Sequence, residues 1–272
     1  MAGKILIDGA FMDSKNFAFN QEHVVATYHG ESHLQKPEEA ILHKLAPELG
    51  DFSMLDMGVG GGRTTIHFAK WVKDYEAMDI SDNMIEASQA RFSNYPIELK
   101  FKLGDAASMD WVDNNSKDFV LFSYNGIDYV DQDTRLKILN EVNRVLKPGG
   151  YFVFSTHNLQ EIDRMFSLRR RWTRNPITLV RRLRKWLLLN FKYNSRELIR
   201  SLKTLPFARF NDGAYDFGLT TYYIKPAAQL EQLDPLFENI HLYSLNDGLE
   251  LSGPLEDIGD SWVYYLCQKP LS

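Results

Sequence analysis

The chain has 272 residues, of which 44% are hydrophobic, 13% aromatic and 25% charged, and its formal net charge is −5. This length and composition support a substantial buried core and exclude disorder, collagen and a coiled-coil rod. A single cysteine, no apolar run near the roughly 18 residues of a spanning helix, and Asp8 and Asp13 near the start favour a cytoplasmic protein without disulfide, signal peptide or membrane span.

Residues 40–157 alternate between short apolar runs, typical of buried strands, and stretches with helical periodicity. Such alternation predicts right-handed crossovers and a mainly parallel sheet covered by helices on both faces. We expect strands at 52–58, 75–80, 101–105, 118–124 and 151–156, with helices at 38–47, 62–73, 82–92 and 134–146.

The pattern changes after Thr156 and returns near the C-terminus. Residues 159–217 predict a basic α-helical cap inserted into one α/β domain. A helix from Pro226 and strands at 238–245 and 261–268 then complete a doubly wound, mainly parallel seven-stranded sheet of Rossmann-like type with an antiparallel C-terminal strand. The expected parts are an N-terminal lid or extension at 1–36, an α/β domain at 37–158 and 218–272, and the cap at 159–217, where an acceptor would bind.

The strongest local signal is LDMGVGGGR at 55–63, where a buried strand ends in glycines before a helix. Without Cβ atoms, Gly58, Gly60 and Gly62 let the backbone turn sharply beneath a ligand, and the following helix presents free N–H groups. The turn indicates a nucleotide-type site, although tight strand-to-helix turns also use glycine for structural reasons. A dinucleotide fingerprint counted from Gly58 needs glycine at position 63, where this chain has arginine, which disfavours a nicotinamide cofactor.

Acidic residues end the next two expected strands. Asp79 stands where a carboxylate can accept hydrogen bonds from both ribose hydroxyls of a nucleoside. Asp105 can accept from an adenine amino group or, alternatively, cap the helix that follows. Together with the glycine turn, these acids predict a site that grips an adenosine.

These motifs, followed by FSYNGIDYV at 122–130 and NEVNRVLKPGGYFVFSTHN at 140–158, resemble in order and spacing those of the class I S-adenosylmethionine-dependent methyltransferases. The resemblance covers about 50–158 closely and 220–268 more loosely. It implies S-adenosylmethionine as cofactor, S-adenosylhomocysteine as product, and a small-molecule acceptor methylated at oxygen or nitrogen.

By position, the resemblance implies that Gly58, Gly60 and Gly62 lie beneath the methionine part of the cofactor, with Arg63 near its carboxylate and Asp79 at the ribose. It implies further contacts around the rest of the cofactor. Ile80 and Met84 would pack at the adenine, Asp105 and Ala106 would meet its edge, Tyr124 and Asn125 would flank the sulfonium, Asp56 would support the loop and amino group, and Tyr28 would belong to a lid.

Methyl transfer by in-line displacement mainly requires collinear geometry in a closed site, so a dedicated base is optional. For a hydroxyl acceptor, a base helps. His157 lies just beyond the fifth strand and is the candidate catalytic base, with a role as loop anchor or packing residue as the alternative. Asp128 is a lesser candidate. The sequence predicts no metal site.

Residues 164–196 contain eleven Lys or Arg and no Asp or Glu, so the rest of the chain is strongly acidic. Four interpretations stay open for this segment: a solvated helix face, contact with an acidic acceptor, a membrane-surface helix, and nucleic-acid contact. Nucleic acid is disfavoured because the acidic body repels a polyanion. The sequence does not indicate an oligomeric state. A tRNA-modifying methyltransferase, a nicotinamide-dependent oxidoreductase and a non-catalytic binding module stand as alternative functions.

Overall fold

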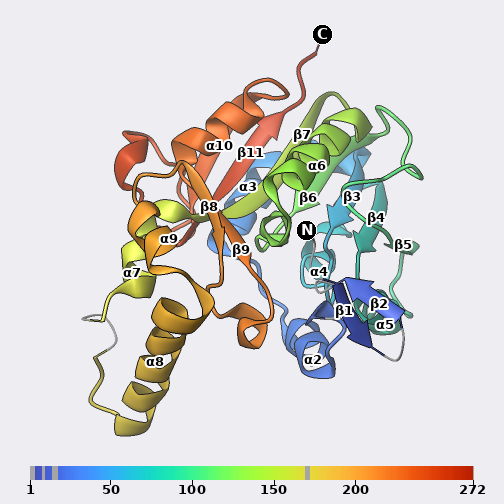
Figure 1. Ribbon diagram of the computed structural model, residues 1–272. Helices are drawn as coiled ribbons and strands as arrows, with labels where there is room; N and C mark the ends of the chain where they lie inside the picture. The colour runs from blue at the N-terminus through green and yellow to red at the C-terminus, as the bar shows by residue number, and fades with distance from the viewer. Residues whose placement is uncertain (1–3, 8–9, 14–17, 169–171, 272) are drawn as a thin grey trace.

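The computed structural model describes residues 4–7, 10–13, 18–168 and 172–271. In this part of the chain the main sheet has nine strands, and seven of them follow the order β10-β11-β7-β6-β3-β4-β5 (Figure 1). Neighbours among β3 to β7 pair in parallel, β11 is antiparallel to β7, and β10 is antiparallel to β11. The expected Rossmann-like sheet with an antiparallel C-terminal strand is therefore confirmed. The seven strands are β3 (Ser53–Met57), β4 (Asp74–Asp79), β5 (Leu99–Leu103), β6 (Lys117–Phe122), β7 (Leu146–Asn158), β10 (Glu238–Ser244) and β11 (Trp262–Gln268).

Helices cover both faces of this sheet because its central strands are apolar on both sides. In β6, Phe119 and Leu121 belong to one core, while Val120 and Phe122 belong to the other. The first core is completed by side chains of α3, α4 and α5, and the second by those of α6 and α10. The bounds of these helices are α3 (Lys36–Leu45), α4 (Thr65–Phe68), α5 (Asp82–Arg91), α6 (Gln132–Val145) and α10 (Pro226–Leu233).

Three segments differ from the sequence-based expectation. The helix expected at 62–73 shortens to the four residues of α4, because the glycine turn precedes it and β4 begins at Asp74. The expected cap also contains a strand, β8 (Phe207–Phe210), which pairs with β9 (Thr221–Ile224); β9 in turn joins the end of β7. An N-terminal hairpin, β1 (Lys4–Ile7) and β2 (Ala10–Asp13), was not expected.

The helices of the cap are α7 (Ile162–Phe166), α8 (Pro176–Leu188) and α9 (Arg196–Ser201), with a π-helical turn at Leu189–Tyr193 between the last two. A small core joins α7 and α9 to β8 and β9. In contrast, α8 extends away from the sheet, while α2 (Glu22–Gly30) lies near α5 (Figure 1). Among the described residues, no helix combines the length and the apolar character needed to cross a membrane.

Candidate functional site

A cleft lies at the carboxyl ends of the parallel strands, where the chain passes outward from β3 toward β4 and β5 on one side and toward β6 and β7 on the other. Open α/β sheets bind ligands at this switch in strand order. Nine residues implied by the sequence line the cleft. They are Tyr28, Gly58, Gly60, Asp79, Ile80, Met84, Asp105, Ala106 and Tyr124.

The glycine turn forms the floor of the cleft. Gly60 adopts a φ of +53°, which L-residues rarely tolerate, and a Cβ there would lie 3.6 Å from the Tyr28 ring. At Gly61 a Cβ would come within 2.6 Å of the His29 backbone, so α2 packs directly on the turn. The glycines of the turn therefore let α2 approach it closely, and Gly58 and Gly60 line the cleft.

Asp79 connects the turn to β4 and faces the cleft. Its Oδ2 accepts from Gly60 N and its Oδ1 from Ser81 N, each at 2.9 Å. Burial raises the pKa of this carboxyl, and the two backbone hydrogen bonds oppose the rise. Each carboxylate oxygen can accept a second hydrogen bond, so Asp79 keeps acceptor capacity for two hydroxyls of a ligand.

The walls of the cleft indicate the charge of its ligand. Among the described residues that line it, Asp79 and Asp105 are the charged side chains, and no Lys or Arg is present. Asp105 also accepts from Ala107 N at 2.9 Å, but this closes a turn: no helix lies between β5 and β6 in the described chain, so the expectation that Asp105 caps a helix is wrong. Two carboxylates beside Ile80, Met84 and other apolar side chains suit a cationic nucleoside with free hydroxyls, and they disfavour a pyrophosphate.

Aromatic side chains from distant segments meet at the cleft, which Phe19, Tyr28 and Tyr129 line. The hydroxyls of Tyr28 and Tyr215 lie 2.7 Å apart, which joins α2 to the loop before β9. Phe19 contacts the rings of Tyr129 and Tyr215 edge to face, with centroids 5.3 and 5.2 Å apart. Tyr28, where the sequence predicts a lid, therefore contacts a residue of the expected cap at 159–217.

Three other implied cofactor residues do not line the cleft. Asp56 supports the turn from below: its Oδ2 accepts from Thr64 Oγ1 at 2.5 Å and from the Tyr75 hydroxyl at 2.6 Å. Burial raises the pKa of Asp56 to about 6, against the lowering effect of these hydrogen bonds. A Cβ at Gly62 would lie 2.3 Å from the Phe92 ring, so this glycine makes room for packing. Asn125 points instead toward His157, with its Nδ2 3.4 Å from the imidazole Nε2.

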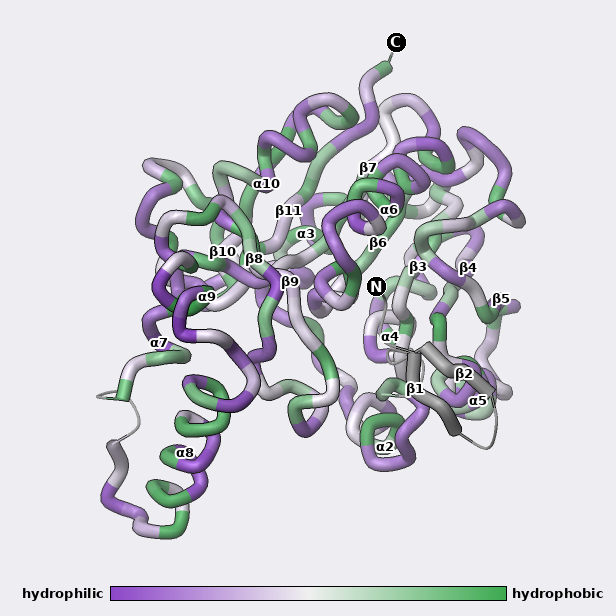
Figure 2. Tube along the Cα trace, viewed as in Figure 1, coloured by the Kyte–Doolittle hydropathy of each residue, from purple (hydrophilic) through white to green (hydrophobic). Residues whose placement is uncertain are grey.

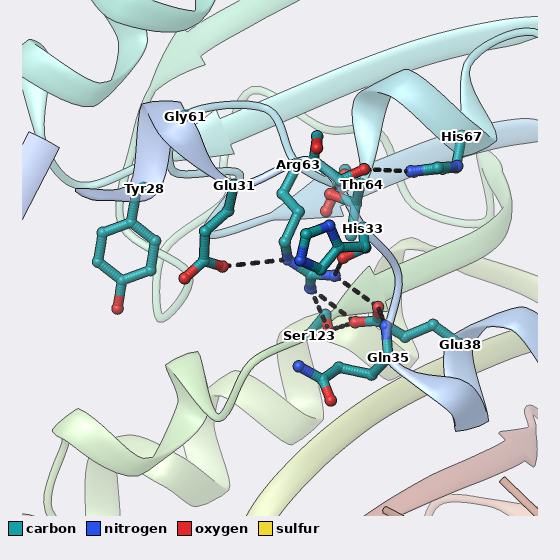
Figure 3. Close-up of polar contacts among 12 residues, drawn as sticks. Tyr28, Glu31, His33, Gln35, Glu38, Gly61, Arg63, Thr64, His67 and Ser123 are labelled. Carbon is teal, nitrogen blue, oxygen red and sulfur yellow. Dashed lines mark hydrogen bonds and ion pairs between the residues drawn. The ribbon is translucent and has the colours of Figure 1, made fainter. Parts of the chain in front are cut away.

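Arg63 also lies outside the lining of the cleft. Its Nη1 donates to Glu38 Oε2 at 2.6 Å and to His33 O at 3.0 Å, and its Nη2 donates to Glu38 Oε1 at 2.7 Å and to Ser123 Oγ at 3.2 Å (Figure 3). The four N–H groups of Nη1 and Nη2 therefore all donate to protein atoms. The expected contact between Arg63 and a cofactor carboxylate does not fit this arrangement, because the guanidinium is held by α3.

His157 forms a dyad with Asp128. The imidazole Nδ1 lies 2.7 Å from Asp128 Oδ2, which also accepts from the backbone N of His157. Asp128 is completely buried, and its Oδ1 accepts from Arg135 Nη1 at 2.7 Å and from Thr156 Oγ1 at 2.6 Å. An Nδ1–H that donates to Asp128 Oδ2 fits this geometry, and the imidazole then presents Nε2 toward Asn125.

The surroundings of His157 hold polar atoms that find no partner among the described residues, namely Asn125 Oδ1 and Trp262 Nε1. The Trp262 ring lies 5.9 Å from the imidazole and 6.2 Å from the ring of Tyr124, which lines the cleft. Buried polar groups usually have hydrogen-bond partners, so unpaired ones beside a cleft suit a ligand that supplies them. Within the described chain, no group of three or more His, Cys, Asp or Glu is placed to hold a metal ion.

Sequence reasoning missed about half of the cleft wall. Gly104 and Gly126 stand next to residues that were identified, so the motifs themselves carried that signal. Phe19 and Ile138 come from elements outside the motifs, and only the tertiary structure brings them in. The missed lining residues are Phe19, Met78, Gly104, Phe122, Ser123, Gly126, Tyr129, Val130 and Ile138.

Comparison with known proteins gives a family match over the part of the chain that contains most of the cleft residues. Residues 54–150 match the family model described as a methyltransferase domain. An uncharacterized methyltransferase of Bacillus subtilis (strain 168) is 29% identical over 122 residues, or 44% of this chain and 47% of that protein. A demethylmenaquinone methyltransferase of Leptospira interrogans is 31% identical over 108 residues, or 38% of this chain and 42% of that protein. The chain thus spans less than half the length of these relatives.

Solved structures share the fold over most of the chain. The 1,6-didemethyltoxoflavin-N1-methyltransferase of Burkholderia thailandensis, with 1,6-didemethyltoxoflavin and S-adenosylhomocysteine bound, has a TM-score of 0.57 at 14% identity, covering 97% of this chain and 93% of that one. At 14% identity this similarity shows a shared fold alone. Because it covers 97% of this chain, the compared region includes the cap.

Proposed function

Since residues 54–150 form a class I S-adenosylmethionine-dependent methyltransferase domain, we propose that this chain transfers a methyl group from S-adenosylmethionine to an oxygen or nitrogen of a small-molecule acceptor. The observation that carries the proposal is the cleft itself: a glycine turn, two carboxylates and apolar walls, with no Lys or Arg among its described lining residues. These features fit an adenosyl sulfonium better than a dinucleotide, whose pyrophosphate is anionic.

The residues present fit the cofactor at three places. The remaining acceptor capacity of Asp79 suits the ribose hydroxyls, Asp105 with Ile80, Met84 and Ala106 suits the adenine, and the floor at Gly58 and Gly60 suits the methionine portion. When bound, S-adenosylmethionine supplies a methyl group on a positively charged sulfur. The Tyr28–Tyr215 contact excludes water from this end of the cleft and limits the directions from which an acceptor enters.

In the proposed reaction, His157 accepts a proton from the acceptor at Nε2, while Asp128 fixes the imidazole tautomer and orientation. Asn125 Oδ1 can accept a hydrogen bond from the methyl-accepting substrate, and Trp262 Nε1 can donate one to it. Relatives act on small organic molecules, since one is named for demethylmenaquinone and another was solved with 1,6-didemethyltoxoflavin bound. The proposal does not include an acidic acceptor. The described Lys and Arg side chains of the cap are exposed on its surface, and none lines the cleft.

Calorimetry with S-adenosylhomocysteine tests the cofactor site. The wild type is expected to bind in the micromolar to submillimolar range, and Asp79→Asn to bind at least about tenfold more weakly, because it loses charge-assisted hydrogen bonds. Asp74→Asn is the matched control: it changes the same residue type in the same strand, at the exposed opposite end. No binding by the wild type at millimolar ligand would reject the proposed function.

The base is tested separately with His157→Gln. Methyl transfer to a small-molecule extract, followed as S-adenosylhomocysteine formation, should fall about 10²–10⁴-fold in kcat, while binding of S-adenosylhomocysteine stays unchanged. A variant with the wild-type rate would show that His157 is a packing residue and would leave the cofactor assignment intact.

A further inference from the structure

The amphipathic helix α8 is the part of the cap that the proposed function does not use. It extends from the body of the molecule, and hydrophobic and hydrophilic residues alternate along it (Figure 2). None of its side chains is fully buried. Most helices of a globular protein bury one stripe against the core, so α8 has an apolar surface without a partner in the described chain.

The apolar surface of α8 is wider than the part that packs on the protein. At 100° per residue, Leu179, Leu183 and Trp186 share one side; they are half-buried, and Trp186 Nε1 donates to Phe166 O at 2.8 Å. Ile177 and Val180 continue the apolar arc beyond this contact, to a total of roughly 180°. Their exposed fractions are 81% and 67%, so this half of the arc faces solvent.

The exposed arc continues past both ends of α8. Leu187 is 52% exposed near its C-terminal end, and Phe191 in the π-helical turn is 55% exposed. Trp172, before the helix, is 76% exposed. Aromatic and large aliphatic side chains at the edges of an amphipathic helix are typical of segments that lie in the interface of a bilayer.

The opposite side of α8 is cationic. Arg181, Arg182 and Lys185 occupy a contiguous arc opposite the centre of the whole apolar arc, and Arg184 interrupts the apolar side. Residues 172–196 contain seven Lys or Arg and no Asp or Glu. All seven are exposed, and none forms an ion pair with a residue that the structure describes. The remainder of the chain is acidic.

We infer that α8 and its flanking residues Trp172 and Phe191 form a docking surface for an anionic lipid membrane. Charge complementarity selects this occupant: the unpaired cations meet anionic headgroups, while the exposed apolar arc enters the boundary with the acyl chains. Self-association through the same face would bring two cationic surfaces together. A nucleic acid would satisfy the cations and leave the apolar side chains in water. The acidic body is repelled by the membrane, so the molecule would dock by α8 alone.

Vesicle co-sedimentation of the full chain tests the inference and needs no methyl acceptor. The wild type should bind vesicles of phosphatidylcholine with about one third phosphatidylglycerol at least about tenfold more tightly than phosphatidylcholine alone, and the preference should shrink as salt is raised. Trp172 provides a second readout, because insertion should shift the fluorescence emission of the wild type to shorter wavelength and that of Trp172→Phe less.

Two variants separate the contributions. Arg181→Glu with Arg182→Glu and Lys185→Glu should lose at least about tenfold in affinity for anionic vesicles. The matched control reverses three exposed lysines of the α/β body, Lys73, Lys100 and Lys137, and should lose much less. Ile177→Ser with Val180→Ser should also weaken binding, through the apolar arc. All these side chains are exposed, so circular dichroism should show wild-type folding.

Three results would overturn the inference. The first is an absence of binding to anionic vesicles by the folded wild type. The second is equal loss in the α8 and control charge variants, which would reduce the effect to net charge. The third is a change of oligomeric state, or loss of affinity for RNA in place of vesicles, caused by the α8 variants; either would assign the face to a different partner.

Discussion

Replacing Glu38 with glutamine removes the negative partner of a buried arginine. Glu38 is completely buried in α3, and its Oε1 accepts from Arg63 and from the Tyr264 hydroxyl, while its Oε2 accepts from Arg63 and from Gln35 N. Burial by itself would raise the pKa of Glu38, but the hydrogen bonds and charge of Arg63 outweigh it and hold the pKa below its ordinary value. The ionised pair joins α3 to the residues after the glycine turn.

The magnitude follows from the burial of both partners. In Glu38→Gln the amide nitrogen would face N–H donors of Arg63 and Gln35, and the guanidinium, 7% exposed, would lose its counter-charge. Removing one member of a buried ion pair typically costs about 3–5 kcal/mol. For a chain of this size that corresponds to a fall in Tm of about 6–20 °C. Glu38→Leu combined with Arg63→Met removes both charges and should recover most of this loss.

Calorimetric melting of the wild type, of Glu38→Leu and Arg63→Met singly, and of the double variant measures the coupling between the two residues. The pH dependence adds a check. Because the pKa of Glu38 is lowered in the folded state, its stabilisation is present above its unfolded pKa of about 4.3 and is lost as the pH falls through the lower folded value. The difference between wild type and Glu38→Gln should therefore shrink in acid. A Tm within about 2 °C of the wild type at pH 7 would refute this account of the pair.

Three further substitutions address the turn and the lid. Gly61→Ala should lower the free energy of unfolding by about 1–3 kcal/mol, since its Cβ meets the α2 backbone, whereas Gly30→Ala, with open space around its Cβ, should be neutral or stabilising; similar melting of both would contradict the packing argument. Burial raises the pKa of Asp56 to about 6, so the native state holds more protons than the unfolded chain between about pH 4 and 6, and this residue alone should cost ~3 kcal/mol of stability as the pH rises through that window. Asp56→Asn should remove this pH-dependent loss of stability between about pH 4 and 6. Parallel pH–stability curves for variant and wild type would contradict the raised pKa of Asp56. Tyr215→Phe deletes the hydrogen bond to Tyr28 and should cost about 1 kcal/mol in urea unfolding while weakening S-adenosylhomocysteine binding; an unchanged affinity would separate Tyr215 from the lid.

Aromatic contacts connect the cap to Tyr28, which lines the cleft. The ring of Tyr193, in the π-helical turn after α8, stacks on Phe217 at 4.6 Å, and Phe217 follows Tyr215 by two residues. Tyr215 then contacts Tyr28 of α2. The segment that carries α8 is therefore connected by packing and a hydrogen bond to Tyr28 in the wall of the cleft.

The sequence by itself determined the seven main strands of the sheet and the backbone frame of the site. Alternating strands and helices force the carboxyl ends of β3, β4 and β5 to one edge, so the glycine turn, Asp79 and Asp105 had to meet there. The relevant signals are local, since strand ends, glycines and capping residues depend on neighbours only a few positions away.

Tertiary structure decided where the side chains point. The sequence shows an arginine after the turn but cannot show that Glu38, from a helix formed earlier in the chain, takes its N–H donors. In the same way, Asp128 and His157 are separated by 29 positions, and Tyr28 and Tyr215 by 187. Hydrogen bonds and ion pairs act over a few ångströms in space, whatever the distance along the chain. Their partners are therefore fixed only when the packed elements bring them together.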